Sequence, residues 1–273
     1  MHRKTIIITI LLIISFIILI VLSSILLNKL GHKKDGIDSY LEFANNNEKP
    51  IFSIDKITYF SNCSADISTN TNSSFTISDL YQYTDIAIFI NNHTEEFGGE
   101  YTAENTLKSV SLSNINFSLK PNHGTPNLYY KNINDFAKPS FESENLINDT
   151  LTFETTTKDE IDYSKPVLYN NCANPITLCY VNSNIKDNYT LSDTIENIEH
   201  NGSLLKTCGI TLNSISCQVS LVVNITNNLD ETFTCPLIIN IPLSTESSTI
   251  YDGNLTLKDS TNYNFIKTQY KMY

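Results

Sequence analysis

An uninterrupted apolar segment from Thr5 to Leu27 opens the chain behind two basic residues, Arg3 and Lys4. At about 1.5 Å per residue, a helix over this segment is about 34 Å long, which is enough to cross a hydrocarbon core of about 30 Å. No second segment of this kind occurs before Tyr273. The sequence therefore predicts one transmembrane helix, residues 5–27, followed by a polar domain.

The length of the segment favours an uncleaved signal-anchor. A cleaved signal peptide has an apolar core of about 7 to 15 residues followed by small residues. This segment is longer and ends in Leu27-Asn28-Lys29. Cleavage after Ser23 stays open as an alternative, because Val21-Leu22-Ser23 satisfies the small-residue rule in part.

The charges that flank the segment are nearly balanced, since two basic residues precede it and three follow it before Asp35. A first apolar segment behind a short basic leader usually acts as an export signal, and long domains translocate largely regardless of their charge. We therefore expect a cell-membrane protein with residues 1–4 in the cytoplasm, 28–50 as a juxtamembrane linker and the remainder outside.

The exported part is acidic. After Lys34 the chain has 13 basic and 29 acidic residues, a net charge of −16, and no cluster of lysine or arginine. Binding to phosphates requires a basic surface that releases counterions. Nucleic acid is therefore excluded as an expected partner.

Two neighbouring segments show the clearest secondary-structure signal. Apolar residues occupy every second position from Ile215 to Ile225 and again from Phe233 to Leu243, on either side of a turn-rich stretch. This period predicts two strands that each bury one face, joined as an antiparallel hairpin. Pro236 and Pro242 fall at outward positions of the second strand, which places that strand at a sheet edge because proline cannot donate a ladder hydrogen bond.

Weaker strand patterns recur along the rest of the chain, and helical patterns are short. The strand candidates are 51–60, 83–90, 107–119, 151–155, 167–169 and 207–212, and the helical candidates are 37–44 and 192–198. Many strands separated by Asn, Ser and Thr turns predict a mainly β fold, an antiparallel β-sandwich.

A short internal sequence repeat bears on the number of domains. The segments 91–97 and 227–233 both match N-N-x-x-E-[ET]-F after an apolar strand, and a polar, acidic stretch lies near 156–163. The repeat predicts two β-sandwich-like regions, 51–156 and 157–273. One continuous domain over 51–273 stays open as the alternative.

The six cysteines form an even set in a domain expected outside the cytoplasm, where disulfides persist. A hairpin over 207–217 would bring Cys208 opposite Cys217, and Cys172 with Cys179 would close a short loop. The alternative is that they are small buried apolar residues. Zinc is not expected, because no C-x-x-C and no cysteine and histidine cluster occurs.

No catalytic residue is predicted. The histidines of the domain, His93, His123 and His200, fall in polar, loop-like settings, and G-x-S-x-G is absent. No cofactor and no metal site is expected. Calcium is kept as an alternative at 227–231, where Asn, Asp and Glu supply oxygen ligands without the EF-hand spacing.

The stretch from 120 to 141 combines three prolines with several aromatic residues and reads as a long, partly rigid connection between strands. Long connections often carry binding function. The predicted binding residues are Tyr129, Tyr130, Lys131 and Phe136. The alternative is that this stretch packs over the sandwich as a lid.

Three short segments carry a resemblance to a known group of proteins. They are 79–85 (Asp-Leu-Tyr-Gln-Tyr-Thr-Asp), 124–131 (Gly-Thr-Pro, then Leu-Tyr-Tyr-Lys from 128) and 172–177 (Cys-Ala-Asn-Pro-Ile-Thr). In these the chain resembles uncharacterised single-pass membrane-anchored proteins of low-GC Gram-positive bacteria. The resemblance implies a bacterial envelope setting, and it transfers no activity and no functional residue.

These features favour a non-enzymatic protein, anchored by residues 5–27, whose β domain binds or scaffolds another envelope component, a protein or the cell wall. An extracytoplasmic hydrolase acting on cell-wall polymer or peptide is the alternative, with a site assembled from distant residues. An accessory subunit of a larger membrane complex would in addition need a large apolar patch on the domain.

Overall fold

The computed structural model describes residues 50–69, 74–192, 199–242, 248–260 and 263–268. The predicted transmembrane segment 5–27, most of the linker, and the helical candidate 37–44 lie outside these ranges, as does most of the candidate 192–198. Within the described ranges, no helix has the length and apolar character needed to cross a membrane.

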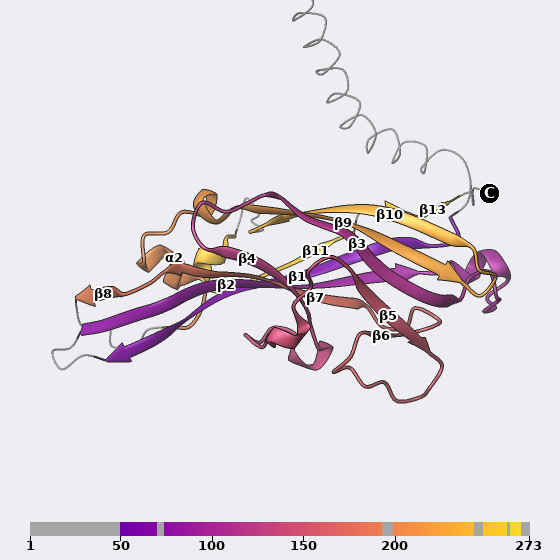
Figure 1. The fold of residues 1–273 in the computed structure, drawn as a ribbon, viewed down its shortest axis with the longest axis horizontal. Coiled ribbons are helices and arrows are strands. Elements are labelled where there is room, and N and C mark those ends of the chain that lie inside the picture. Colours follow the sequence, from indigo (N-terminus) through magenta and orange to yellow (C-terminus); the bar gives the residue numbers. More distant parts are fainter. Residues whose placement is uncertain (1–49, 70–73, 193–198, 243–247, 261–262, 269–273) are drawn as a thin grey trace, which may run out of the picture. The chain divides into compact units, whose positions relative to one another are not determined.

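The described strands form two sheets (Figure 1). The first sheet has the order β11-β1-β2-β7-β4, with β12 beside β1 and β8 beside β2. Its strands are β1 Ser53–Thr69, β2 Ser74–Asn91, β4 Thr125–Tyr130, β7 Ile176–Lys186, β8 Tyr189–Ser192, β11 Leu255–Asp259 and β12 Tyr263–Asn264. The second sheet has the order β13-β10-β9-β3-β5-β6. Its strands are β3 Leu107–Leu119, β5 Leu151–Thr156, β6 Val167–Tyr169, β9 Cys217–Asn227, β10 Thr232–Ile241 and β13 Ile266–Lys267.

The helical elements are short and lie in the connections. They are α2 Ser203–Thr207 and the 3-10 helices η1 Thr94–Phe97, η2 Ile133–Asp135, η3 Ser143–Asn145, η4 Leu212–Ile215 and η5 Ile250–Asp252. The prediction of a mainly β fold is therefore confirmed. The sheets are antiparallel as expected apart from β5 and β6, which pair in parallel.

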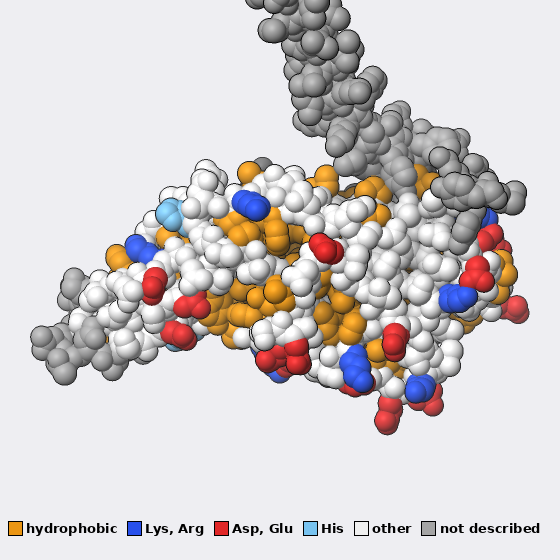
Figure 2. Space-filling view, viewed as in Figure 1, with side chains coloured by type: hydrophobic (Ala, Val, Ile, Leu, Met, Phe, Trp, Pro, Cys, Tyr) orange, Lys and Arg blue, Asp and Glu red, His pale blue; other side chains and the backbone are white. Residues whose placement is uncertain are grey.

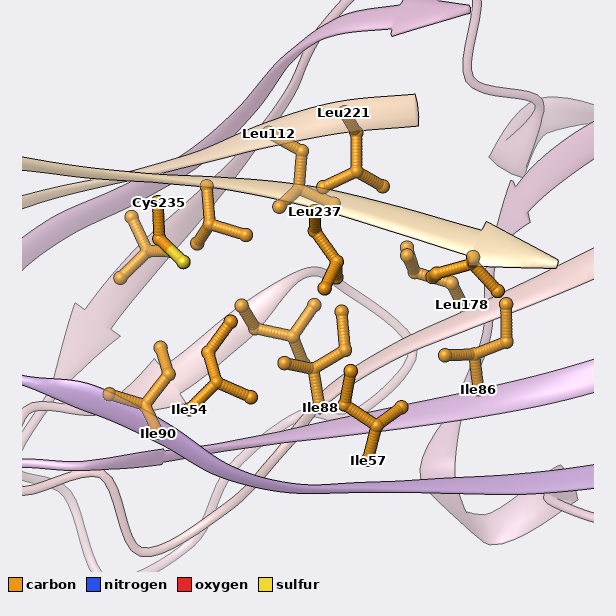
Figure 3. Close-up of a cluster of buried hydrophobic side chains, with 14 of the residues drawn as sticks. Ile54, Ile57, Ile86, Ile88, Ile90, Leu112, Leu178, Leu221, Cys235 and Leu237 are labelled. Carbon is orange, nitrogen blue, oxygen red and sulfur yellow. The ribbon is translucent and has the colours of Figure 1, made fainter. Parts of the chain in front are cut away.

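The main core lies between the two sheets. Figure 3 shows isoleucines of β1 and β2 facing Leu112, Leu221, Cys235 and Leu237 of the second sheet. The predicted hairpin is confirmed, since β9 and β10 pair antiparallel and β9 alternates buried and half-buried residues along its whole length. β10 pairs with β13 only at Phe233 and Thr234, so the rest of its described length borders no further strand on that side.

A second apolar cluster lies toward the far ends of the same long strands. It contains Cys63 and Leu80 together with Leu204 and Leu205 of α2. Between the two clusters, β1 and β2 carry a buried polar belt in which the Gln82 amide donates to the hydroxyls of Ser61 and Thr84 at 3.0 and 2.6 Å. These hydrogen bonds offset the cost of burying the polar groups inside the sandwich.

Strands from the two halves of the sequence are mixed in both sheets. β7 of the later half lies between β2 and β4 of the earlier half, and β3 and β5 of the earlier half lie between β9 and β6 of the later half. The polar stretch near 156–163 therefore separates no sheet from another, and all described strands belong to one compact unit, Lys49–Tyr273. The two repeated segments, 91–97 and 227–233, also differ in conformation, since Phe97 ends a 3-10 helix whereas Phe233 is buried in β10.

The strand expected over 207–212 is wrong. Residues Ser203–Thr207 form α2, Cys208 caps it, and η4 follows, because Leu204 and Leu205 pack into the second cluster. Cys208 therefore lies in the second cluster and Cys217 in the first. The six cysteines are free thiols in the structure, in place of the expected pairs of Cys208 with Cys217 and Cys172 with Cys179.

Titration of the thiols tests this arrangement. Without reductant, we expect six thiols per chain in denaturant and slow labelling of the folded protein. Slow labelling follows because the thiolate is the reactive form, and burial raises the pKa of the Cys172 and Cys235 thiols to about 12. Each disulfide in the isolated protein would remove two thiols from the denatured count and would contradict the free-thiol arrangement.

Candidate functional site

The outward face of the first sheet carries an unusual group of side chains. Asp85 of β2 lies opposite Cys179 of β7, which in turn lies opposite Tyr129 of β4. Successive side chains of a strand point to opposite faces, so these three share the face that points away from the main core. The segment that follows β4 covers this face.

A buried ion pair holds that segment in place. The side chains of Lys131 and Asp85 are 1% and 0% exposed, and Lys131 Nζ lies 3.4 Å from Asp85 Oδ1. The same Nζ donates to the carbonyl oxygens of Lys138 and Ser140, each at 2.6 Å. The other carboxylate oxygen of Asp85 accepts the backbone N–H of Ala137 at 2.8 Å. One buried pair thus fixes residues 137–140 against the sheet.

One carboxylate oxygen of this pair lacks a hydrogen bond within the described part of the chain. Asp85 Oδ1 lies within ion-pair distance of Lys131 but has no hydrogen bond with any described residue. Charge-assisted N–H···O bonds are usually about 2.7–2.9 Å long. Burial raises the pKa of Asp85 above its usual range, although Lys131 opposes this effect. Burial also raises the pKa of the adjacent Cys179 thiol.

Half-buried aromatic rings lie on the same face, packed against Tyr83 and Cys179, and form a surface that we call the aromatic patch, consisting of Phe60, Tyr81, Tyr129 and Phe141. The Phe141 ring lies 5.7 Å from that of Tyr81 and 5.6 Å from that of Tyr129, measured between centroids. Leu146 is 38% exposed and forms an isolated antiparallel β-bridge with Tyr129 of the patch. Figure 2 shows hydrophobic side chains exposed among polar ones on the side of the domain where Figure 1 places β4.

The four predicted binding residues do not form one exposed surface. Tyr129 belongs to the aromatic patch, whereas the Lys131 side chain is buried and pairs with Asp85. Tyr130 is buried in the main core, where its hydroxyl lies within hydrogen-bond distance of the carbonyl oxygens of Tyr163 and Lys165. Phe136 is half-buried at the end of η2. Strand alternation explains the split, because neighbouring residues of β4 point to opposite faces.

The sequence interpretation missed Tyr81, Asp85 and Phe141. The available signal was the pair of tyrosines, Tyr81 and Tyr83, at outward positions of β2 ahead of Asp85, where simple polar residues are expected. Phe141 had no such signal, since its position depends on the turn anchored by Lys131.

The loop kept as a calcium alternative is closed by hydrogen bonds of its own. The Asn227 side chain accepts the N–H groups of Leu229 and Glu231 and donates to the Glu104 carbonyl. Asp230 pairs with Lys108, and Glu231 pairs with Lys267. Across the described ranges, no three His, Cys, Asp or Glu side chains converge in an arrangement for a metal ion.

A hydrogen-bond chain near the start of β1 has the order of a catalytic relay. His93 Nε2 lies 2.8 Å from Ser53 Oγ, and its Nδ1 lies 2.9 Å from Glu95 Oε1. However, Ser53 donates its hydroxyl proton to Asp55 and is 1% exposed. A nucleophile must give its proton to the base and reach the substrate. These hydrogen bonds therefore hold the end of β2 in place, and they do not support the hydrolase alternative.

Comparison with models of protein families, with curated proteins and with solved structures finds no match.

Proposed function

We propose that this protein is anchored in the cell membrane by residues 5–27 and binds another component of the cell envelope, without catalysing a reaction, through the aromatic patch. The observation that carries the proposal is the position of Phe141, whose ring is held against Tyr81 and Tyr129 by a segment tied to the buried pair.

Aromatic side chains suit this role for two reasons. Tyrosine and phenylalanine bury a large area and have few rotatable bonds, so little conformational entropy is lost when they are covered. The turn anchored by Lys131 also orders the segment that carries Phe141 before any partner arrives. A surface that is ordered in advance loses less free energy on binding.

Site-specific photo-crosslinking of the full chain in its native cells tests the proposal. A benzophenone amino acid replaces Phe141 in one variant and Tyr129 in a second. The matched control replaces Tyr101, which is 59% exposed on a different loop. We expect a cross-linked adduct of one defined mass from both patch variants and none from the control.

Two results would count against the proposal. One is an equal yield of the same adduct from Tyr101, which would show non-specific capture. The other is the absence of any adduct from both patch positions in cells where the protein is correctly inserted. If an adduct forms, Tyr81→Ser in the same variant should reduce its yield, because Tyr81 shares the patch.

A further inference from the structure

We propose that Lys131 and Asp85 form an intramolecular amide bond that joins β2 to the end of β4. Both side chains are withdrawn from solvent, and Lys131 Nζ lies 3.4 Å from a carboxylate oxygen of Asp85. Both are also held by the backbone, Asp85 within β2 and Lys131 by mutual hydrogen bonds with Thr177. Groups held close together in a fixed orientation react as if at very high local concentration.

The environment favours the amide over the ion pair. Taking two full charges out of water can cost more free energy than their mutual attraction returns. Amide formation removes both charges. The rings of Tyr83 and of the aromatic patch exclude the water that would otherwise stabilise the charged state.

The reaction needs no external reagent. A proton passes from the Lys131 ammonium to the Asp85 carboxylate, which gives a neutral amine and a carboxylic acid. The nitrogen lone pair then attacks Cγ of Asp85, the C–OH bond breaks, and a second nitrogen proton leaves with the hydroxyl as water. Lysine, aspartate and their charges are thereby converted into one amide and one water molecule.

Neighbouring groups are placed to assist each stage. The carbonyls of Lys138 and Ser140 accept protons of Nζ and so orient the amine. The Ala137 N–H donates to Asp85 Oδ2 and would stabilise the negative charge that develops there. The Cys179 thiol adjoins Asp85 and can carry the second proton to the leaving hydroxyl. After reaction, the remaining N–H still has a carbonyl acceptor.

Mass spectrometry of the purified full chain tests the proposal. We expect the denatured protein to be lighter than its sequence by one water molecule. After digestion, fragmentation should identify a branched peptide that joins residue 131 to residue 85, with trypsin unable to cleave after Lys131. Lys131→Arg and Asp85→Ala should both restore the full mass. The matched control Lys138→Arg, at an exposed neighbouring lysine, should keep the mass deficit.

The measurement on the wild-type chain is decisive even if a variant fails to fold. A linear wild-type peptide cleaved after Lys131, together with an unmodified peptide containing Asp85, would overturn the proposal. A mass deficit located at any other residue would overturn it as well. Cys179→Ser separately tests the proton carrier, and an unchanged linked fraction would remove Cys179 from the mechanism. None of these results depends on whether the aromatic patch binds a partner.

Discussion

Replacing Lys131 with methionine is expected to lower the free energy of unfolding by about 3–5 kcal/mol. Methionine fills a similar volume but leaves the Asp85 carboxylate buried without a counter-charge. It also leaves the carbonyls of Lys138 and Ser140 without the donor that now serves both. The expectation holds for the ion pair and for the amide alike, because either one holds residues 137–140 to the sheet.

Denaturant unfolding of the full chain measures the effect, with Lys138→Met as the control. The Lys138 side chain is 63% exposed and its ion pair with Asp135 lies at the surface, so its replacement should change stability by less than about 0.5 kcal/mol. Equal losses for the two variants would show that the buried pair contributes nothing particular. Loss of photo-crosslinking at Phe141 in the Lys131 variant would further link the pair to the aromatic patch.

Replacing Gly202 with alanine is expected to cost about 3 kcal/mol or more, which is at the upper end for overpacking. A Cβ at this position would lie 1.9 Å from the carbonyl oxygen of Ile250 and 2.6 Å from that of Gly253. Both atoms belong to the backbone around η5, so the contact can be relieved only by moving η5 away from α2. That movement would open the second apolar cluster, to which Ile250 belongs.

Gly209→Ala is the matched control in the same connection. Gly209 has a φ of 70°, and a Cβ added to it would meet no described atom within 4 Å. Its replacement should lower the free energy of unfolding by only about 1–2 kcal/mol, which is the cost of placing a residue with a side chain in the left-handed backbone conformation. Thermal or denaturant unfolding compares the two variants. A smaller loss for Gly202→Ala than for Gly209→Ala would contradict the packing argument.

Strands could be predicted from the sequence where one face of the strand is buried and the other is exposed or half-buried. The alternation in 215–225 and 233–243 predicted β9 and β10, and the candidates 107–119 and 167–169 coincide with β3 and β6. The strand expected at 207–212 failed because a short apolar run does not distinguish a strand from a buried helical turn. There the packing of Leu204 and Leu205 into the second cluster decided the outcome.

The site was only partly predictable for a different reason. The sequence analysis placed Tyr129 and Lys131 in a long connection, where a lysine is expected to be exposed. This prediction was wrong, because Thr125–Tyr130 forms β4 and the Lys131 side chain is buried. Its burial depends on Asp85, and the two meet only because β7 pairs with both β2 and β4. Register between strands that are distant in the sequence leaves no local pattern, so the pair could not be read from composition or spacing.

The mixing of early and late strands in both sheets has a consequence for how this domain can be transferred between proteins during evolution. A cut near 156–163 would leave each fragment with sheets that lack internal strands, and so with unpaired backbone groups and an open core. Neither half is a transferable module. The domain can be duplicated, fused or inserted into another chain only as a whole, which makes its two ends the natural points of recombination.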